Sequence, residues 1–400
     1  MDDLSASKDR VCAEVDAMQD DLVSLSTRIH EHPEVGLQEH QAARWIGAFL
    51  EDAGFTVERS IAGLETAFRA RHRGAKDRPH VALLAEYDAL AGLGHACGHN
   101  LICMASAGAA AALRRATPSL PGTLTVLGTP AEETVGGKVI MVDRGVFAGI
   151  DAVMMFHPSR NNWWTRGALA AQSLTAAFHG RAAHAAAMPE AGINALNALL
   201  LTYRGIDALR QHVTSDVRIH GVITHGGDAP NIVPAFARGE FLVRASTRKA
   251  LVDVMAKVRR CAEGAALATG ARVELTEGLV YAERNNNRVL AGLFAENMRR
   301  LGVEGEPAPS QGGVGSSDIG NVSLVVPTIH PYLKIADDVS GHTPEFREAA
   351  RSPRGYAAML LAAKGLAMTA LDVMGRPGAV EEMWSEFRST LASTPPQASL

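Results

Sequence analysis

The chain has 400 residues and a net charge of −4, and it holds no basic block, so its composition does not point to nucleic acid or to a membrane surface as a partner. Apolar residues make up 47% of the chain, as in ordinary globular proteins. No uncharged apolar run of about 18 residues appears, and the charged N-terminal segment lacks an apolar core, so we predict neither a membrane span nor a signal peptide. The four cysteines show no CxxC spacing, which indicates a reducing cytoplasm without a disulfide framework.

Predicted helices and strands alternate through the first 160 residues or so. Apolar periodicity and breaker residues predict helices over 8–31, 38–53, 100–115 and 137–143, and strands over 66–71, 80–86, 121–130 and 151–158. Such alternation is typical of an α/β fold with a doubly wound, mainly parallel sheet. In these folds the ligand site gathers at the carboxyl ends of the strands.

The pattern changes at about residue 168. Residues 168–281 read as strand 170–179, helix 190–212, strands 217–224 and 239–247, helix 249–269 and strand 272–279. This βαββαβ order predicts a ferredoxin-like α+β unit. Predicted elements over 286–301, 323–331, 352–374 and after Pro377 then return to the first pattern. We therefore expect a catalytic domain of residues 1–167 and 282–400 that carries residues 168–281 as an insertion.

The loop between the strand at 81–85 and the helix that follows it is rich in metal-ligand residue types. Its sequence AEYDALAGLGHACGHN places Asp88, His95, Cys97 and His99 close together. Thiolate and imidazole groups are good ligands for zinc-like ions. The loop therefore predicts part of a metal site, which residues from other segments must complete.

Further ligand-type residues follow other predicted strands and complete a set of six: Cys97, His99, Glu132, Glu133, His157 and His342. Six such residues can hold two divalent ions that activate water and polarise a carbonyl. In the Glu132–Glu133 pair one carboxylate can bind metal while the other takes a proton from water, although such a pair can equally be a solvated turn. The nearby stretch EETVGGKV lacks Walker spacing, so nucleotide binding is not predicted there.

Eight motifs in order along the chain resemble the M20 metallopeptidases. They are HACGHN, TPAEE, MMFHP, GRAAHAA, APNIVP, FLVRAST, GSSDIGNVS and GHTPEF. The resemblance covers nearly the whole chain and is closest to the M20D amidohydrolase branch, to its p-aminobenzoyl-glutamate hydrolase subunits and the related M20 domain-containing protein 2 dipeptidases. It implies a zinc- or manganese-dependent catalytic domain with an inserted lid that also forms a homodimer.

The resemblance also implies roles for individual residues. Cys97 would bridge two metal ions, with His99 and His157 on one ion and Glu133 and His342 on the other. Glu132 would be the general base, and we expect Asp88 to be a further catalytic residue.

Residues of the inserted domain and of the GSSD motif receive roles from the same resemblance. His184 would reach the partner subunit's site and stabilise the oxyanion. Asn231 would bind the substrate, and Arg244 would form an ion pair with a substrate carboxylate. Ser316 and Ser317 stand at a predicted helix start, where backbone N–H groups can bind an anion.

Two positions depart from the family pattern. Glu86-Tyr87-Asp88 stands where many M20 enzymes have His-x-Asp, so His99 must replace the first histidine ligand. Asn100 stands where M20D proteins mostly have aspartate and cannot supply a carboxylate to orient His99. Either one or two metal ions per chain are therefore compatible with the sequence.

Taken together, the sequence predicts a cytoplasmic, homodimeric, metal-dependent amidohydrolase. Its substrate would be a small N-acyl or N-aroyl amino acid or a dipeptide that carries a carboxylate. A hydrolytic deaminase, or another C–N hydrolase, is the enzymatic alternative. A metal-binding subunit without turnover is a further alternative, which the intact Glu132 argues against.

Overall fold

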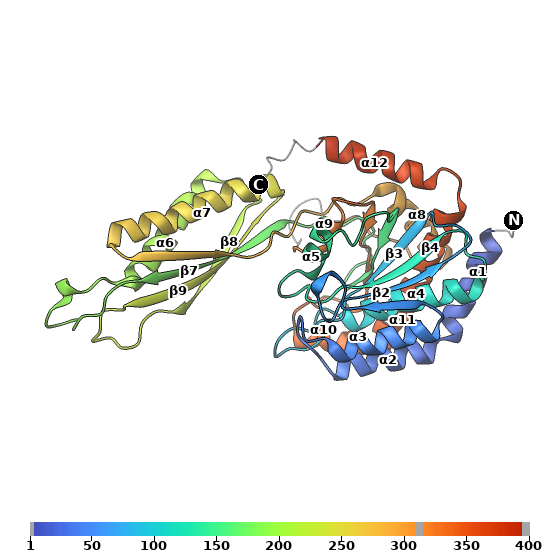
Figure 1. Ribbon diagram of the computed structural model, residues 1–400, viewed down its shortest axis with the longest axis horizontal. Coiled ribbons are helices and arrows are strands. Elements are labelled where there is room, and N and C mark those ends of the chain that lie inside the picture. The colour runs from blue at the N-terminus through green and yellow to red at the C-terminus, as the bar shows by residue number, and fades with distance from the viewer. Residues whose placement is uncertain (1–3, 309–314, 394–400) are drawn as a thin grey trace. The chain divides into compact units, whose positions relative to one another are not determined.

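The computed structural model describes residues 4–308 and 315–393 and divides into two compact units (Figure 1). Unit 1 contains the chain up to Gly167, the segment that begins at Arg284, and the chain from Ser317 onward. Unit 2 contains Ala168–Glu283 together with a short segment that ends at Ser316. We had expected the insertion to span residues 168–281. Each unit has its own hydrophobic core.

Unit 1 is built on a six-stranded sheet in the order β1-β2-β4-β3-β5-β11, counted over the described residues. The strands are β1 Thr56–Arg59, β2 Phe68–Arg73, β3 His80–Ala85, β4 Thr123–Gly128, β5 Ala152–Met154 and β11 Thr328–Ile329. From β4 to β11 neighbouring strands are parallel, whereas β1 and β2 are antiparallel. The predicted α/β fold with a mainly parallel sheet is confirmed. Sequence analysis missed β1, a mostly exposed strand without an apolar pattern.

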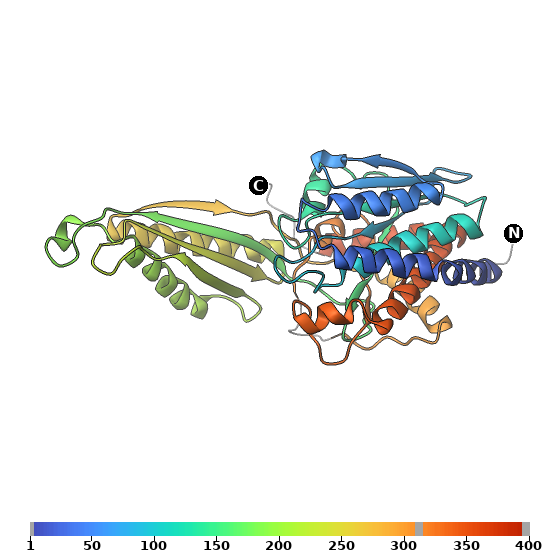
Figure 2. The same cartoon turned by 90° about the horizontal axis from the view of Figure 1, so that it is seen from below.

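Helices cover this sheet in layers. Those of unit 1 are α1 Leu4–Ala17, α2 Gln19–Glu31, α3 His40–Asp52, α4 His99–Ala116, α5 Gly137–Asp143, α8 Arg288–Arg300, α9 Ile319–Val322, α10 Pro344–Ala349, α11 Pro353–Gly375 and α12 Ala379–Ser393, with a 3₁₀ helix at Ile61–Gly63. Figure 2 shows α2, α3 and α4 running side by side. Helix α4 is almost wholly buried because its alanine and glycine positions allow close packing: a Cβ at Gly108 would lie 2.8 Å from a methyl carbon of Leu22.

Helix α11 is the one helix of the described chain that is long and apolar enough to cross a membrane, judged by length and composition alone. Its apolar window is 83% buried inside the structure. The helix packs against α1, α4 and α8 in the core of unit 1. Core packing therefore accounts for its composition.

Three predicted elements of unit 1 have different bounds in the structure. The predicted helix 8–31 is two helices, because the buried Met18 leaves helical geometry between α1 and α2. The predicted strand 323–331 pairs only at Thr328–Ile329, after α9 and a turn. The strand predicted to end at His157 stops at Met154, and His157 begins β6 His157–Ser159, which pairs with β12 Tyr332–Lys334 in a separate sheet.

Unit 2 is a four-stranded antiparallel sheet in the order β10-β7-β9-β8, packed against two helices. Its elements are β7 Ala170–His179, α6 Ala195–Leu209, β8 Arg218–His225, β9 Phe236–Ala245, α7 Arg248–Thr269 and β10 Arg272–Glu277, with 3₁₀ helices at Pro189–Ala191 and Arg210–His212. This is the predicted βαββαβ order. Helix α6 is shorter than predicted because the Asn194 side chain accepts the Asn197 N–H and caps it.

Candidate metal centre

The loops that follow β3, β4 and β5 in unit 1 bring the predicted ligands together. Cys97 lies just before α4, and His99 is the first residue of that helix. Gly98 between them has φ of 78°, and a Cβ there would lie 2.8 Å from Pro158 Cγ, so the turn depends on glycine. Glu133 follows β4, and the backbone N–H of His342 donates to the carbonyl oxygen of Ala96 at 2.9 Å.

Ligand atoms of these residues fall into three groups within which every pair lies no more than 4.8 Å apart. The groups are Cys97 with His99 and His157, Cys97 with Glu133 and His342, and His99 with Glu132 and Glu133. Cys97 belongs to two of them, the position that a bridging ligand would take. His95 belongs to none of these groups, and burial lowers the pKa of its ring to about 3.

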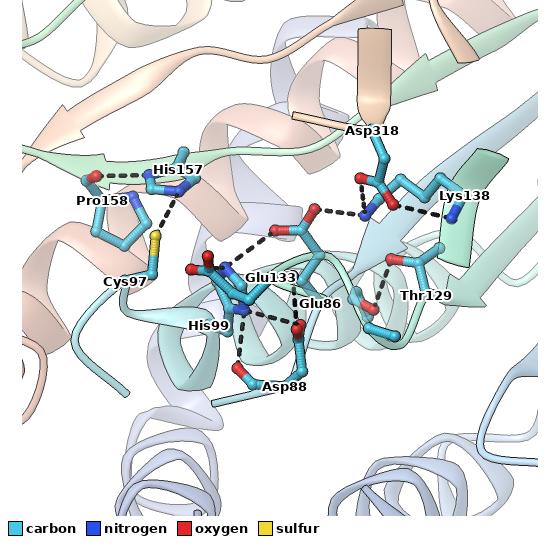
Figure 3. Close-up of polar contacts among 12 residues, drawn as sticks. Glu86, Asp88, Cys97, His99, Thr129, Glu133, Lys138, His157, Pro158 and Asp318 are labelled. Atoms are coloured by element: carbon cyan, nitrogen blue, oxygen red, sulfur yellow. Dashed lines mark hydrogen bonds and ion pairs between the residues drawn. The ribbon is translucent and has the colours of Figure 1, made fainter. Parts of the chain in front are cut away.

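Hydrogen bonds orient two of the histidine rings for this role (Figure 3). His99 Nδ1 donates to the backbone oxygen of Asp88 at 2.8 Å, and His157 Nδ1 donates to the carbonyl oxygen of Pro158 at 2.7 Å. A carbonyl oxygen only accepts, so in each neutral ring the proton is on Nδ1 and the lone pair is on Nε2. His157 Nε2 lies 3.4 Å from Cys97 Sγ, and His99 Nε2 is buried without a hydrogen-bond partner.

The donor set fits a divalent metal ion of the zinc or manganese kind. It combines one thiol sulfur, three imidazoles and at least one carboxylate around a common space. Within the described chain His99 Nε2 makes no hydrogen bond, and a Glu86 carboxylate oxygen lies 3.5 Å from it, so a cation bound there would satisfy both groups. The geometry accommodates one ion or two.

Asp88 connects two of the ligand-bearing loops. One carboxylate oxygen accepts from His99 Nδ1 at 3.0 Å, and the other accepts the backbone N–H of Glu133 at 2.9 Å. Asp88 therefore supplies the orienting carboxylate that Asn100 lacks. The Asn100 amide instead donates to Ser26 Oγ and to the carbonyl oxygen of Ala350, which is a packing role. These contacts favour a positioning role for Asp88, which is almost fully buried.

The environment separates the pKa values of the adjacent glutamates. Burial, with the charge of Glu133, raises the pKa of Glu132 well above its usual range. For Glu133 burial acts in the same direction, but the hydrogen bond with His342 and the charge of His99 outweigh it and lower the pKa. Two neighbouring carboxyl groups with opposite shifts suit a proton acceptor beside a permanent carboxylate.

A buried ion-pair cluster behind the site was not predicted from the sequence. Lys138 Nζ lies 2.5 Å from Glu86 Oε1 and 2.9 Å from Asp318 Oδ1, and its backbone N–H donates to Asp318 Oδ2 (Figure 3). All three side chains are almost fully buried. The second oxygen of Glu86 lies 3.5 Å from His99 Nε2, so the cluster adjoins the ligands. The sequence feature that could have indicated this cluster is the lysine of EETVGGKV. We considered that stretch only as a possible phosphate-binding loop.

Four of the predicted substrate-contacting residues belong to unit 2: His184, Asn231, Arg244 and Ser316. Ala185 N–H donates to the backbone oxygen of Asn231 at 3.0 Å, so His184 and Asn231 lie on adjoining segments. His184 Nδ1 accepts from the N–H groups of Ala186 and Ala187, so a neutral His184 ring carries its proton on Nε2.

Arg244 lies on β9, and its guanidinium donates to Ser316 Oγ at 3.2 Å. Ser317 belongs to unit 1, and most of the loop before these serines, 309–314, lies outside the described residues. Helix α9 has only four residues, and the Asp318 side chain does not cap it but binds Lys138.

Arg244 and His184 lie at opposite ends of the β7–β9 pair. Arg244 is opposite Ala171, near the start of β7, whereas His184 follows the end of β7 at His179. His179 lies eight positions beyond Ala171 along the extended strand, which corresponds to about 25 Å. One copy of unit 2 therefore cannot place both side chains on the same small molecule.

Comparison with known proteins relates this geometry to a family. The family model described as Peptidase family M20/M25/M40 matches residues 82–364. The Xaa-Arg dipeptidase of Mus musculus is 40% identical over 97% of this chain and 94% of its own length. A p-aminobenzoyl-glutamate hydrolase subunit of Escherichia coli (strain K12) is 29% identical over 95% of each chain.

A solved structure shows the same fold. It is a Bacillus subtilis protein described as a dinuclear metal binding peptidase from the M20 family, with a TM-score of 0.66 and 22% identity over 90% of this chain and 99% of that one. The resemblance predicted from the motifs is thus confirmed at the level of the family.

The first prediction concerns Asp88. In the Asp88→Asn variant one amide oxygen and no charge remain, so the side chain cannot accept from both His99 and Glu133. We expect affinity for Zn²⁺ or Mn²⁺ to fall roughly 10- to 100-fold, measured by competition with a chelating dye. The exposed Asp143→Asn is the matched control. Unchanged affinity in Asp88→Asn would show that the carboxylate does not position the ligands.

The second prediction concerns Lys138. Lys138→Met leaves Glu86 and Asp318 buried without their cation, which costs about 3–5 kcal/mol of unfolding free energy at neutral pH. Burial already raises the pKa of Asp318 while Lys138 lowers it, so the substitution raises it further. A group with a raised folded pKa stabilises below its unfolded pKa and loses that contribution as pH rises. The deficit should therefore be larger at pH 8 than at pH 5 in urea unfolding.

Two further variants make this measurement decisive. Lys76→Met removes an exposed lysine of unit 1 and should leave stability unchanged. Lys138→Met combined with Glu86→Gln removes one of the two uncompensated charges and should recover part of the loss. A deficit that does not vary with pH would mean that lost packing, not charge, is responsible.

Proposed function

This chain belongs to peptidase family M20/M25/M40 and is a hydrolase of amide bonds, and we propose that it uses a divalent metal ion with Glu132 as the general base. The observation that carries the proposal is the pair of ligand groups that share Cys97, with Glu132 beside them. We propose that Cys97 bridges two ions, that His99 and His157 bind one, and that Glu133 and His342 bind the other. Occupancy by a single ion is the alternative that the geometry leaves open.

The roles of the residues follow from their environments. A bound divalent ion lowers the pKa of water and polarises the scissile carbonyl. Glu132, whose pKa is raised by burial and by Glu133, takes the proton of the attacking water and passes it to the leaving nitrogen. Asp88 accepts hydrogen bonds from His99 and from the backbone N–H of Glu133, and so fixes the positions of these two residues relative to each other. His184 offers an Nε2–H donor of the kind that stabilises a developing oxyanion.

For the substrate we propose a small N-acyl or N-aroyl amino acid or a dipeptide with a free carboxylate. The names of the relatives support this class, since one is a dipeptidase and another a p-aminobenzoyl-glutamate hydrolase subunit. Arg244 supports it as well: burial lowers the pKa of its guanidinium, and its buried Nε has no hydrogen-bond partner among the described residues. A substrate carboxylate would satisfy it, with Ser316 and Ser317 as further contacts. Asn231 lies on the segment that adjoins His184, so it would contact the substrate from the other copy of the chain.

We propose further that residues 168–281 form a lid through which two copies of the chain associate. The separation of Arg244 from His184 along β7 and β9 supports this, because a small substrate can meet both side chains only if they come from different copies. We place the protein in the cytoplasm, since its cysteines are free and scattered.

The third prediction tests the activity itself. Purified protein should hold up to two Zn²⁺ or Mn²⁺ ions per chain by elemental analysis, and exhaustive chelation should abolish hydrolysis. A panel of aroyl-glutamates, acyl-amino acids and dipeptides, including those with C-terminal arginine, should contain at least one substrate. Readdition of metal should restore its turnover. Full activity in metal-free protein, or no hydrolysis of any panel member by metal-loaded protein, would contradict the proposal.

The fourth prediction separates the glutamates and tests the shared site. Glu132→Gln should keep its metal and lose roughly 10²–10⁴-fold in rate, because a positioned base contributes that much. Glu133→Gln should lose metal instead. Mixed with His184→Ala chains in equal amounts, Glu132→Gln chains should regain roughly a quarter of wild-type activity. Half of the dimers are then hybrids, and each hybrid has one of its two sites intact.

The control for the mixing experiment is each variant incubated alone, which should stay inactive. If His184 serves the site of its own chain, the hybrids stay inactive as well. If His184 only packs on the surface, His184→Ala is active from the start. Either result would remove the shared site while leaving the metal ligands as assigned.

A further inference from the structure

Two arginines in unit 1 lie over the same aromatic ring without a counter-ion. The guanidinium carbons of Arg166 and Arg284 lie 5.2 and 5.6 Å from the centroid of the Tyr332 ring, and Arg166 also lies 4.6 Å from that of Trp163. Arg284 Nη1 donates to Tyr332 Oη at 3.0 Å and to the carbonyl oxygen of Arg166 at 3.3 Å. Among the described residues, no carboxylate pairs with either guanidinium.

This arrangement is electrostatically incomplete. Arg284 is only 9% exposed, and the buried Nε atoms of both arginines have no hydrogen-bond partner in the part of the chain that the structure describes. Arg166 is partly exposed, and burial, together with the charge of Arg284, lowers the pKa of its guanidinium. Both cations therefore lose hydration, and their charges repel each other. Lys138 shows how the same unit treats another buried cation, since it pairs with two carboxylates. The aromatic faces supply only a fraction of that compensation.

A third polar group joins the two arginines. His330 is 1% exposed, and across residues 4–308 and 315–393 neither of its ring nitrogens has a hydrogen-bond partner. Its ring centroid lies 4.9 Å from that of Tyr332 and 5.3 Å from that of His157. A neutral imidazole always carries one N–H, so His330 offers an additional donor. Three side chains with unused donors thus surround Tyr332.

The cluster adjoins the candidate metal centre through paired strands. Tyr332 on β12 is the register partner of His157 on β6, and their ring centroids lie 5.4 Å apart. Trp163 and Tyr332 exchange two backbone hydrogen bonds of 2.7 and 3.0 Å, which hold the aromatic platform rigid. A group bound by the arginines would therefore lie beside a residue that we assign to the metal.

We propose that Arg166, Arg284 and His330 form a carboxylate-binding subsite in unit 1, separate from Arg244, that receives a carboxylate of the substrate. The inference rests on the proposed amidohydrolase function for the identity of the ligand, but the charge imbalance belongs to the chain itself. A carboxylate accepts from two guanidinium groups at once and neutralises the repulsion between them. The enzyme would then prefer substrates with an anionic group near the scissile bond over those with a cationic one.

Binding without turnover tests the subsite. In the Glu132→Gln background, calorimetry would compare N-benzoylglutamate with its α-amide and its γ-amide, each of which removes one of the two carboxylates. We expect Arg166→Gln or Arg284→Gln to weaken N-benzoylglutamate roughly 10- to 100-fold, the range for a charged hydrogen bond. The amide whose binding no longer responds to these substitutions identifies which carboxylate the subsite holds. Arg160→Gln, an exposed neighbour, is the matched control and should change nothing.

The outcomes separate this subsite from the proposed function. Arg284 also ties the backbone at Arg166, so circular dichroism and melting must show that each variant is folded. If Arg284→Gln is not folded, Arg166→Gln carries the test, because the Arg166 side chain donates no hydrogen bond within the described part of the chain. Equal affinities in Arg166→Gln and its parent, or no binding of any carboxylate probe, would overturn the subsite even if the enzyme hydrolyses amides. Arginine-dependent binding without hydrolysis would keep the subsite and reject the activity.

Discussion

The need to compensate buried negative charge governs the catalytic end of unit 1. Glu86, Asp88 and Asp318 are almost fully buried, and the half-buried Glu132 and Glu133 lie next to them. Carboxylates so close together repel one another unless cations or hydrogen-bond donors intervene. Lys138 and His99 provide part of the compensating positive charge. The arrangement of the candidate ligands leaves a position where a metal ion would provide the rest. The chemistry that we assign to Glu132 depends on this balance, because burial, and after it the charges of the neighbouring carboxylates, raise its pKa.

Much of the fold and of the candidate metal centre could be predicted from residue patterns, because these features depend on short stretches of sequence. Buried strands such as His80–Ala85 are recognisable in the sequence as continuous apolar runs. Parallel strands bring their carboxyl ends to the same edge of the sheet. Residue type and strand ends therefore pointed to most of the candidate ligands, whereas their individual roles came from the family resemblance. Asp88 could be singled out by its place in the loop, but its two hydrogen bonds, which make it a positioning group, depend on the path of the following turn.

What the sequence did not predict arises from contacts between distant segments. Lys138 meets Asp318 across 180 positions, and no periodicity signals such a pair. The helix break at Met18 and the shortness of β11 likewise depend on packing, which overrides local propensity. Arg166 and Arg284 are 118 positions apart, and nothing in the sequence shows that both guanidinium groups lie beside the Tyr332 ring.

The carbonyl oxygen of Arg166 accepts from Arg284 Nη1 and from Asn286 Nδ2 at 2.9 Å, so the chain leaves unit 1 and re-enters it at neighbouring points. Unit 1 therefore has a nearly continuous path of its own, and a short loop suffices to join residue 167 to residue 284. An insertion with adjoining ends can be acquired or lost in a single genetic event without unravelling the host sheet. The adjoining boundaries thus meet the geometric requirement for exchanging the antiparallel unit as a whole module.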